Sequence, residues 1–314
     1  MVGEEAAPRP LMLLDAASLY FRAFHGIPDS VTAPDGTPIN AVRGFLDTIA
    51  RLVRTRTPGT LVACMDADWR PAFRTAAVPA YKAHRVGPDG DEEAVPEALL
   101  PQVPVIEDCL DALGIARVGV PGYEADDVIG TLAAAADGEV EVVTGDRDLF
   151  QVVDDERGIR VLYTARGVRN LQIVDDAWLR AKYGVPGAQY ADFALLRGDP
   201  SDGLPGVPGV GERTAADLVG RYGDLSGLLA ALDGGSLSAG PTAKLRGARA
   251  YLEAAQVVVR VATDAALPPY DPALPARAAA PDRLVELSDR FGLDNPLNRV
   301  LDALTGAQPT GAHR

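Results

Sequence analysis

The sequence is poor in cysteine, in lysine and in long hydrophobic runs. Cys64 and Cys109 are the only cysteines among 314 residues, and both lie in apolar segments, which predicts free thiols in a reducing compartment. No apolar run approaches the length of a membrane-spanning helix. The N-terminal segment MVGEEAAPRP lacks the basic and apolar regions of a secretion signal, so we expect a cytoplasmic protein.

Lysine contributes only three of the 30 basic residues, Lys82, Lys182 and Lys244, so each lysine is more informative than one of the many arginines. The formal net charge of −14 argues against a simple basic surface for nucleic acid. The length and the apolar fraction of 47% suit one large globular domain or two smaller ones.

Acidic side chains gather in residues 121–148. Some precede an apolar segment typical of a helix, and others follow a segment in which valines alternate as in a buried strand. These acids are Glu124, Asp126, Asp127, Asp146 and Asp148. Taken alone, the pattern is equally consistent with helix capping followed by an Asp-rich turn.

The rest of the N-terminal half favours a cluster of acids. Short apolar strands are expected at 11–14, 61–65 and 115–120, and they alternate with helices, which predicts a parallel sheet. Asp15 and Asp66 follow two of these strands, and the carboxyl ends of parallel strands meet at one edge. So many carboxylates need counter-charge, and hard divalent cations supply it. The sequence offers no His/Cys ligand set for zinc.

A glycine-rich segment, GDPSDGLPGVPGVG, follows at 198–211 and adds Asp199 and Asp202. It opens an amphipathic helix, an arrangement that presents backbone N–H groups to an anion such as phosphate. A tight turn between two helices without a ligand is the alternative. Further helices are expected at 244–261 and at 284–304, and the last of them is expected to pack back on the core.

In combination these motifs resemble the 5′-nuclease family, that is, the flap endonuclease/5′→3′ exonuclease domain of bacterial DNA polymerase I and its free-standing relatives. The resemblance runs from about residue 11 to about residue 225, and a weaker resemblance covers 290–301. Its motifs are LLDAASLYFRAFH, FR, YKAHR, GYEADD, TGDRD and GDPSDGLPGVPGVGERTA. Three positions depart from the family pattern, namely Ala16, Gly203 and Arg213, and none of them is a ligand position.

The resemblance implies an α/β fold with a mainly parallel central sheet flanked by helices, a helical arch and a C-terminal helical region. We expect a nuclease domain over residues 1–190, with the arch at about 70–104. A helical DNA-binding region is expected over 191–304, with a helix-hairpin-helix at about 199–220. The tail at 305–314 is expected to be disordered.

The resemblance also implies roles for single residues. Two or three Mg²⁺ or Mn²⁺ ions would be bound by Asp15, Asp66, Glu124, Asp126, Asp127, Asp146, Asp148, Asp199 and Asp202. Lys82 and Arg85 would face the scissile phosphate as catalytic residues, with a solvated basic helix face as the alternative. DNA contacts are expected from Arg22, His25, Arg74 and Tyr81, although His25 suits a packed position equally well. Gly209 and Gly211 would hold duplex phosphates, with K⁺ as an accompanying ion.

The expected function is that of a bacterial, cytoplasmic nuclease that cuts DNA at 5′ flaps, nicks and single-stranded 5′ ends in replication and repair, including the removal of RNA primers from Okazaki fragments. RNA–DNA hybrids are a further substrate class that the resemblance allows. Few residues follow the last expected helix, so no attached polymerase is expected. The alternatives are a catalytically weak or inactive DNA-binding relative, and a metal-dependent ribonuclease or phosphatase on a similar acidic sheet.

Overall fold

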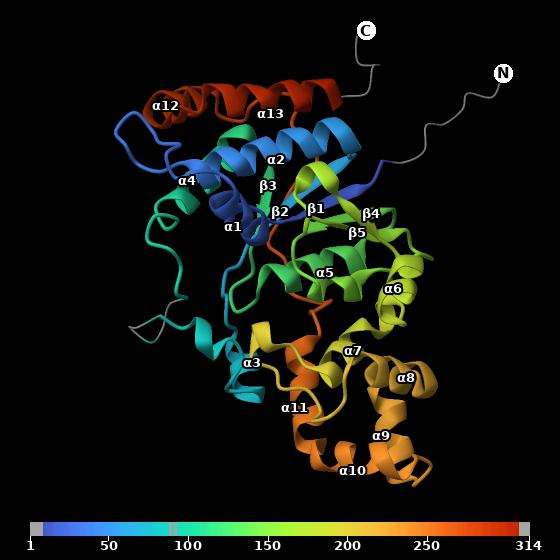
Figure 1. Cartoon of the computed structure of the whole chain (residues 1–314). Coiled ribbons are helices and arrows are strands. Elements are labelled where there is room, and N and C mark those ends of the chain that lie inside the picture. The colour runs from blue at the N-terminus through green and yellow to red at the C-terminus, as the bar shows by residue number, and fades with distance from the viewer. Residues whose placement is uncertain (1–8, 88–89, 91–92, 308–314) are drawn as a thin grey trace, which may run out of the picture.

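The computed structural model describes residues 9–87, 90 and 93–307. At its centre lies a six-stranded sheet in the order β3-β2-β1-β4-β5-β6 (Figure 1). Its strands are β1 (Leu11–Asp15), β2 (Thr60–Cys64), β3 (Ala116–Val118), β4 (Val140–Thr144), β5 (Ile159–Tyr163) and β6 (Gln172–Val174). Neighbouring strands are parallel except for β5 and β6, which confirms the mainly parallel sheet.

Helices cover both faces of the sheet and continue beyond it. The α-helices are α1 (Ala16–Gly26), α2 (Asn40–Arg56), α3 (Ala72–Ala77), α4 (Gln102–Leu113), α5 (Ala125–Ala135), α6 (Asp176–Tyr183), α7 (Tyr190–Arg197), α8 (Glu212–Tyr222), α9 (Leu225–Asp233), α10 (Ala239–Gly247), α11 (Arg249–Val259), α12 (Pro281–Phe291) and α13 (Asp294–Ala307). The 3₁₀ helices are η1 (Ala83–Arg85), η2 (Asp148–Val152), η3 (Val168–Asn170), η4 (Gly187–Gln189) and η5 (Pro200–Asp202).

The side chains of β1 alternate between two hydrophobic layers, as the period of a strand requires. Met12 and Leu14 are buried with residues of α2, α4, α12 and α13. Leu13 belongs to the opposite layer, which includes α5 and runs on into α7, α8, α9 and α11. Because strands buried on both faces read as continuous apolar runs, the segment LMLL was recognisable as a strand.

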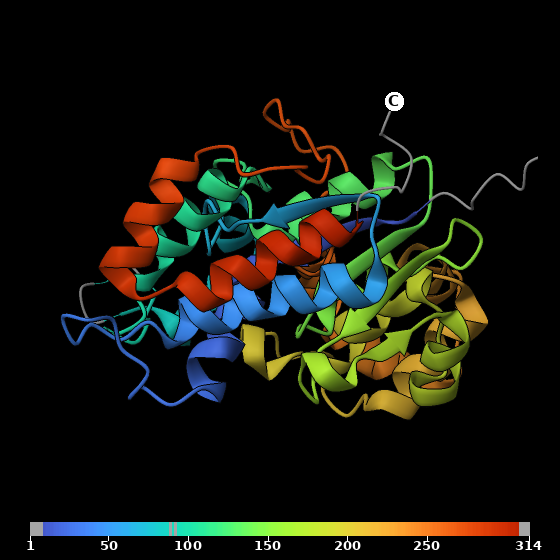
Figure 2. The same ribbon diagram turned by 90° about the horizontal axis from the view of Figure 1, so that it is seen from above.

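The C-terminal segment returns to the sheet after α11. The Leu61 N–H donates to the Pro272 carbonyl at 2.8 Å, and the Ala280 N–H donates to the Ala112 carbonyl at 3.0 Å. Helix α13 then lies along α2, and α12 packs against α4 (Figure 2). Residues 281–304 therefore accompany the α/β layer, not the helical region expected to run to 304.

Several other expectations need correction in detail. The single helix expected at 284–304 is two helices, because Gly292 ends α12 at a φ of +66°. The helix expected at 244–261 is likewise divided, into α10 and α11. Of the expected disordered tail, residues 305–307 belong to α13, and 308–314 lie outside the described residues. In the part described, no helix is both long and apolar enough to cross a membrane.

Candidate active site at the carboxyl edge of the sheet

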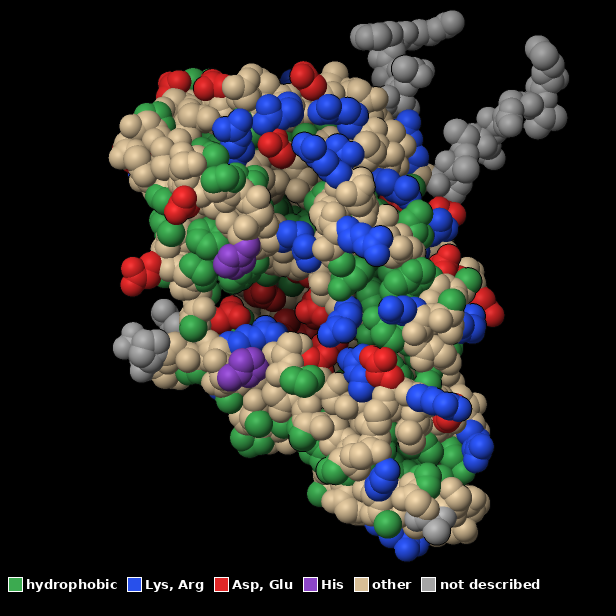
Figure 3. All heavy atoms as spheres, viewed as in Figure 1, with side chains coloured by type: hydrophobic (Ala, Val, Ile, Leu, Met, Phe, Trp, Pro, Cys, Tyr) green, Lys and Arg blue, Asp and Glu red, His purple; other side chains and the backbone are tan. Residues whose placement is uncertain are grey.

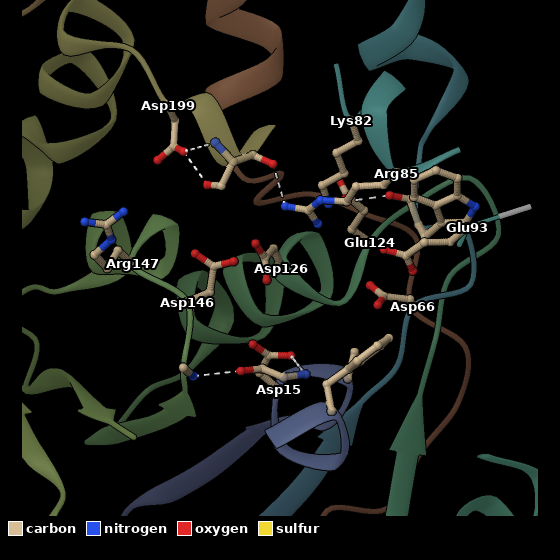
Figure 4. Close-up of a pocket in the computed structure, with 16 residues that line it drawn as sticks. Asp15, Asp66, Lys82, Arg85, Glu93, Glu124, Asp126, Asp146, Arg147 and Asp199 are labelled. Carbon is tan, nitrogen blue, oxygen red and sulfur yellow. Dashed lines mark hydrogen bonds and ion pairs between the residues drawn. The ribbon is translucent and has the colours of Figure 1, made fainter. Parts of the chain in front are cut away.

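Acidic side chains converge where the parallel strands end. In the register of the sheet, Leu14 lies beside Val143 and Asp15 beside Cys64, so the segments that follow β1, β2 and β4 leave the same edge. A cleft of about 440 Å³ opens there, and acidic side chains line its hollow (Figure 3). The acids that line it and that the sequence predicted are Asp15, Asp66, Glu124, Asp126, Asp146 and Asp199 (Figure 4). The expectation that Asp15 and Asp146 share one rim is confirmed.

A chain of hydrogen bonds ties the end of β1 to the end of β4. Asp15 accepts from the Ser18 N–H at 3.1 Å and from the Thr144 hydroxyl at 2.5 Å. The Thr144 hydroxyl in turn accepts from the Asp146 N–H at 2.8 Å, and the Gly145 N–H donates to the Ser18 hydroxyl at 2.8 Å. These contacts fix the Asp15 carboxylate and the Asp146 backbone on adjoining strand ends.

The cleft carries more negative charge than its surroundings balance. Burial raises the pKa of Asp15 to about 7, and the charges of Asp66 and Asp146 add to the effect. The pKa of Asp126 is raised well above its usual range by burial and then by Asp146 and Asp15. Asp148 is not among the residues that line this cleft, but burial and the charge of Asp146 raise its pKa in the same way. Such carboxylates are stabilised by a cation that enters the cleft.

The donor set fits hard divalent cations such as Mg²⁺ or Mn²⁺, because carboxylate oxygens line the cleft and His and Cys do not. Among the described residues, no group of three or more Asp, Glu, His or Cys side chains already stands close enough to hold an ion. The fit therefore rests on the chemistry of the donors and on the uncompensated charge of Asp15 and Asp126.

Glu124 is one of the acids that basic side chains already contact. Its carboxylate accepts from the Lys82 ammonium, from the Arg74 guanidinium and, at 2.8 Å, from the Tyr81 hydroxyl. Burial raises the pKa of Glu124, whereas the charges of Lys82 and Arg74 oppose that rise. Glu124 thus connects the segment that carries Lys82 with the acidic residues of the cleft.

The structure overturns three of the expected roles. Asp127 is fully buried and pairs with both terminal nitrogens of Arg74 at 2.7 Å, so it faces the core and is not placed to bind metal. Arg74 is only 2% exposed, and the Tyr81 side chain is buried with its hydroxyl on Glu124, so direct DNA contacts from these two are wrong. Arg74 also donates to the Val258 carbonyl at 3.1 Å, which joins α3, α5 and α11.

Lys82 and Arg85 stand on a short segment that docks on η5. The Lys82 N–H donates to the Asp202 carbonyl at 3.0 Å, and the Arg85 guanidinium donates to the Asp202 carboxylate at 2.9 Å. Although burial alone would lower the pKa of Lys82, the charges of Glu124 and Asp202 raise it. Both basic side chains line the same cleft as the acids (Figure 4).

Gly203 allows this docking. Its φ of +74° lies in the left-handed region, and a Cβ added there would stand 2.5 Å from the Ala80 carbonyl oxygen. Lys82 itself has a φ of +49°, which is uncommon for a residue with a side chain. The departure from the family pattern at Gly203 thus coincides with a very close backbone approach beside Lys82.

Among the residues that line the cleft and that the sequence did not predict as site residues are Trp69, Glu93 and Arg147. Glu93 lies in the segment expected to form the arch, and burial raises its pKa. Arg147 lies between the two aspartates of the TGDRD motif, but the motif did not predict a role for it. No pattern in the sequence distinguishes Glu93 from its acidic neighbours, because its place in the cleft depends on the tertiary structure.

The remaining predictions of DNA contacts, at Arg22, His25, Gly209 and Gly211, are untested, but the structure shows the surroundings of these residues. Arg22 is half-buried, donates to the Ala165 carbonyl at 3.4 Å, and has a buried Nε without a partner in the described part of the chain. His25 is exposed at the end of α1. Gly209 has a φ of +75°. Gly211 is the N-cap of α8 and has no side chain that could accept from the first N–H groups of the helix.

Comparison with known families matches nearly the whole chain. The model described as 5′-3′ exonuclease, N-terminal resolvase-like domain, matches residues 10–184, and the model described as 5′-3′ exonuclease, C-terminal SAM fold, matches residues 185–281. A protein of Streptomyces coelicolor named 5′-3′ exonuclease is 61% identical over 94% of this chain and 100% of its own length. A protein of the same name from Mycobacterium tuberculosis is 51% identical over 94% of this chain and 98% of its own length.

Solved structures share the fold at much lower identity. T5 5′-exonuclease, solved with divalent zinc, matches with a TM-score of 0.63 and 17% identity over 96% of this chain and 100% of that chain. The catalytic core of Rad2 in complex with DNA substrate matches with a TM-score of 0.56 and 16% identity over 96% of this chain and 93% of that chain.

Proposed function

The chain belongs to the 5′-3′ exonuclease family, and on this premise we propose that it hydrolyses phosphodiester bonds at 5′ flaps and 5′ ends of DNA with Mg²⁺ or Mn²⁺. The observation that carries the proposal is the cleft in which Asp15, Asp126 and Asp146 face the basic wall of Lys82 and Arg85. The expected products carry a 5′-phosphate and a 3′-hydroxyl. The expected role is in replication and repair, including the removal of RNA primers from Okazaki fragments.

The carboxylates are proposed to hold the ions, and the basic residues to act on the substrate. The proposed ligands are Asp15, Asp66, Glu124, Asp126, Asp146, Asp148, Asp199 and Asp202. Divalent ions bound there would supply Lewis-acid stabilisation of the charge that develops during phosphodiester hydrolysis. Lys82 and Arg85 hold fixed positive charge on the opposite wall, where it stabilises negative charge on the phosphate. The bonds of the Lys82 backbone N–H and of the Arg85 guanidinium to Asp202 keep that charge in place.

Two further features support a DNA path. The Gly-rich turn before α8 offers N–H groups to the phosphates of a duplex. A separate cavity of about 590 Å³ is lined by Arg22, Arg51, Arg54 and Arg169, among other residues. Local basic groups of this kind attract a phosphate backbone although the whole chain is acidic.

The test compares three substrates: a 5′-flap DNA, a single-stranded RNA and a phosphate monoester. Each is incubated with Mg²⁺, with Mn²⁺ and with EDTA. The proposal requires metal-dependent cleavage of the flap DNA that is much faster than turnover of the other two. Preferential hydrolysis of the monoester or of the RNA would identify a phosphatase or ribonuclease instead, and binding without cleavage would identify an inactive relative. The cytoplasmic location stays a prediction.

A further inference from the structure

The turn between α7 and α8 is contacted by a lysine from a distant part of the chain. Gly206 and Gly209 both adopt positive φ, +67° and +75°, so the backbone bends sharply before α8. At Gly209 the carbonyl oxygen accepts a hydrogen bond of 2.7 Å from the Nζ of Lys244. Lys244 comes from the last turn of α10, which lies 35 positions further along the chain.

The fit between Lys244 and Gly209 is close. A Cβ at position 209 would stand 3.1 Å from Nζ and 3.3 Å from Cε of Lys244, so the lysine stem crosses the face of the glycine. Lys244 is one of only three lysines among 30 basic residues, and its side chain is exposed at this position. A compact ammonium suits a single carbonyl, whereas a guanidinium presents a planar fork.

A carbonyl oxygen beside a phosphate-binding turn would repel the phosphate. A cation that contacts both the carbonyl and the phosphate removes that repulsion. An ammonium has three donors, and the bond to Gly209 uses one of them. The charge at Lys244 is therefore placed to balance the carbonyl dipole and to attract a phosphate at the same turn.

We infer that Lys244 supplies from within the chain the positive charge that family resemblance assigns to a K⁺ ion at this turn. This inference rests on the proposed function only in taking the turn as a site for duplex phosphates. A K⁺ ion bound to the Gly209 carbonyl would have to displace the ammonium, so the residues present do not fit the ion. Duplex binding by this chain is then independent of K⁺.

The experiment measures the affinity for a flap duplex by fluorescence anisotropy in EDTA, where no cleavage occurs. Titrations are run in KCl and in tetramethylammonium chloride at equal ionic strength, because the organic cation is too large to bind between carbonyls. The wild-type Kd is expected to agree within about twofold in the two salts. Lys244→Met is expected to bind about tenfold more weakly in tetramethylammonium, the loss of one charge-assisted contact, and to regain part of that loss in K⁺.

Arg246→Met is the matched control, since it removes an exposed positive charge from the same helix without touching Gly209. An equal loss in both variants, with no salt difference, would reduce Lys244 to a nonspecific surface charge and overturn the inference. Wild-type binding that requires K⁺ would also overturn it while leaving the proposed function intact. A wild-type protein that binds flap duplex in neither salt would refute both. Thermal unfolding of each variant checks that α10 is retained.

Discussion

The close approach at Gly203 makes one substitution especially informative. Gly203→Ala adds a single methyl group at a φ of +74°, where it would stand 2.5 Å from the Ala80 carbonyl oxygen. The new methyl group must force the segment that carries Lys82 away from η5, or the turn itself must shift. Either movement lengthens the bond between the Lys82 N–H and the Asp202 carbonyl, which is 3.0 Å in the native structure.

The magnitude follows from two contributions. The left-handed φ alone costs a residue with a Cβ about 1–2 kcal/mol. Overpacking against the Ala80 carbonyl adds about 1–3 kcal/mol. Gly36 provides the matched control, because its φ is +90° but nothing lies within 4 Å of an added Cβ. Gly36→Ala therefore carries the first contribution alone.

The assay combines urea denaturation with single-turnover cleavage of a 5′-flap DNA. Gly203→Ala is expected to lose more unfolding free energy than Gly36→Ala by about 1–3 kcal/mol. Its turnover is expected to fall at least about tenfold, since the basic wall is displaced. DNA affinity should change little. If the two variants are equally stable and Gly203→Ala cleaves like wild type, the docking of the Lys82 segment on η5 is not needed for cleavage, which refutes the argument.

Three further predictions concern the charges of the cleft. Lys82→Ala should lower turnover by about 100-fold or more with a much smaller loss of DNA affinity, and equal losses would assign Lys82 to substrate holding. Asp199→Asn with Asp202→Asn should abolish cleavage in Mg²⁺ but tighten flap-DNA binding in EDTA at low salt, and weaker binding by a folded double variant would refute the electrostatic argument. Because the folded pKa of Asp15 is about 7 and its usual value is 3.8, the metal-free protein should lose stability as pH rises between these values, and Asp15→Asn should flatten that slope in thermal unfolding.

The sheet and its acidic rim were predictable because each strand is a short apolar run and the acids follow directly. The orientation of single acids was not. Asp126 and Asp127 are adjacent in one motif, yet Asp126 lines the cleft whereas Asp127 pairs with Arg74, 53 positions away. Local sequence contains no information about that partner, so both acids were assigned to metal and Arg74 to DNA.

Tertiary packing also decided the C-terminal part of the fold. The periodicity of residues 284–304 indicated an apolar helical face but not its break at Gly292. The strands β5 and β6 and the helix α6 were not expected, since no pattern was recognised in residues 150–190. The close approach at Gly203 depends on Ala80, a residue of a different segment, and no local pattern reports it.

The most direct test of the central claim is a count of bound Mn²⁺ by electron paramagnetic resonance in wild type, Asp126→Asn and Asp127→Asn. Asp126→Asn should bind at least one Mn²⁺ fewer per chain than wild type and should lose cleavage of 5′-flap DNA. Asp127→Asn should keep the wild-type Mn²⁺ count, and its defect should appear as lower stability, since it breaks the buried pair with Arg74. An Asp126→Asn variant that binds Mn²⁺ and cleaves as wild type does would contradict the account.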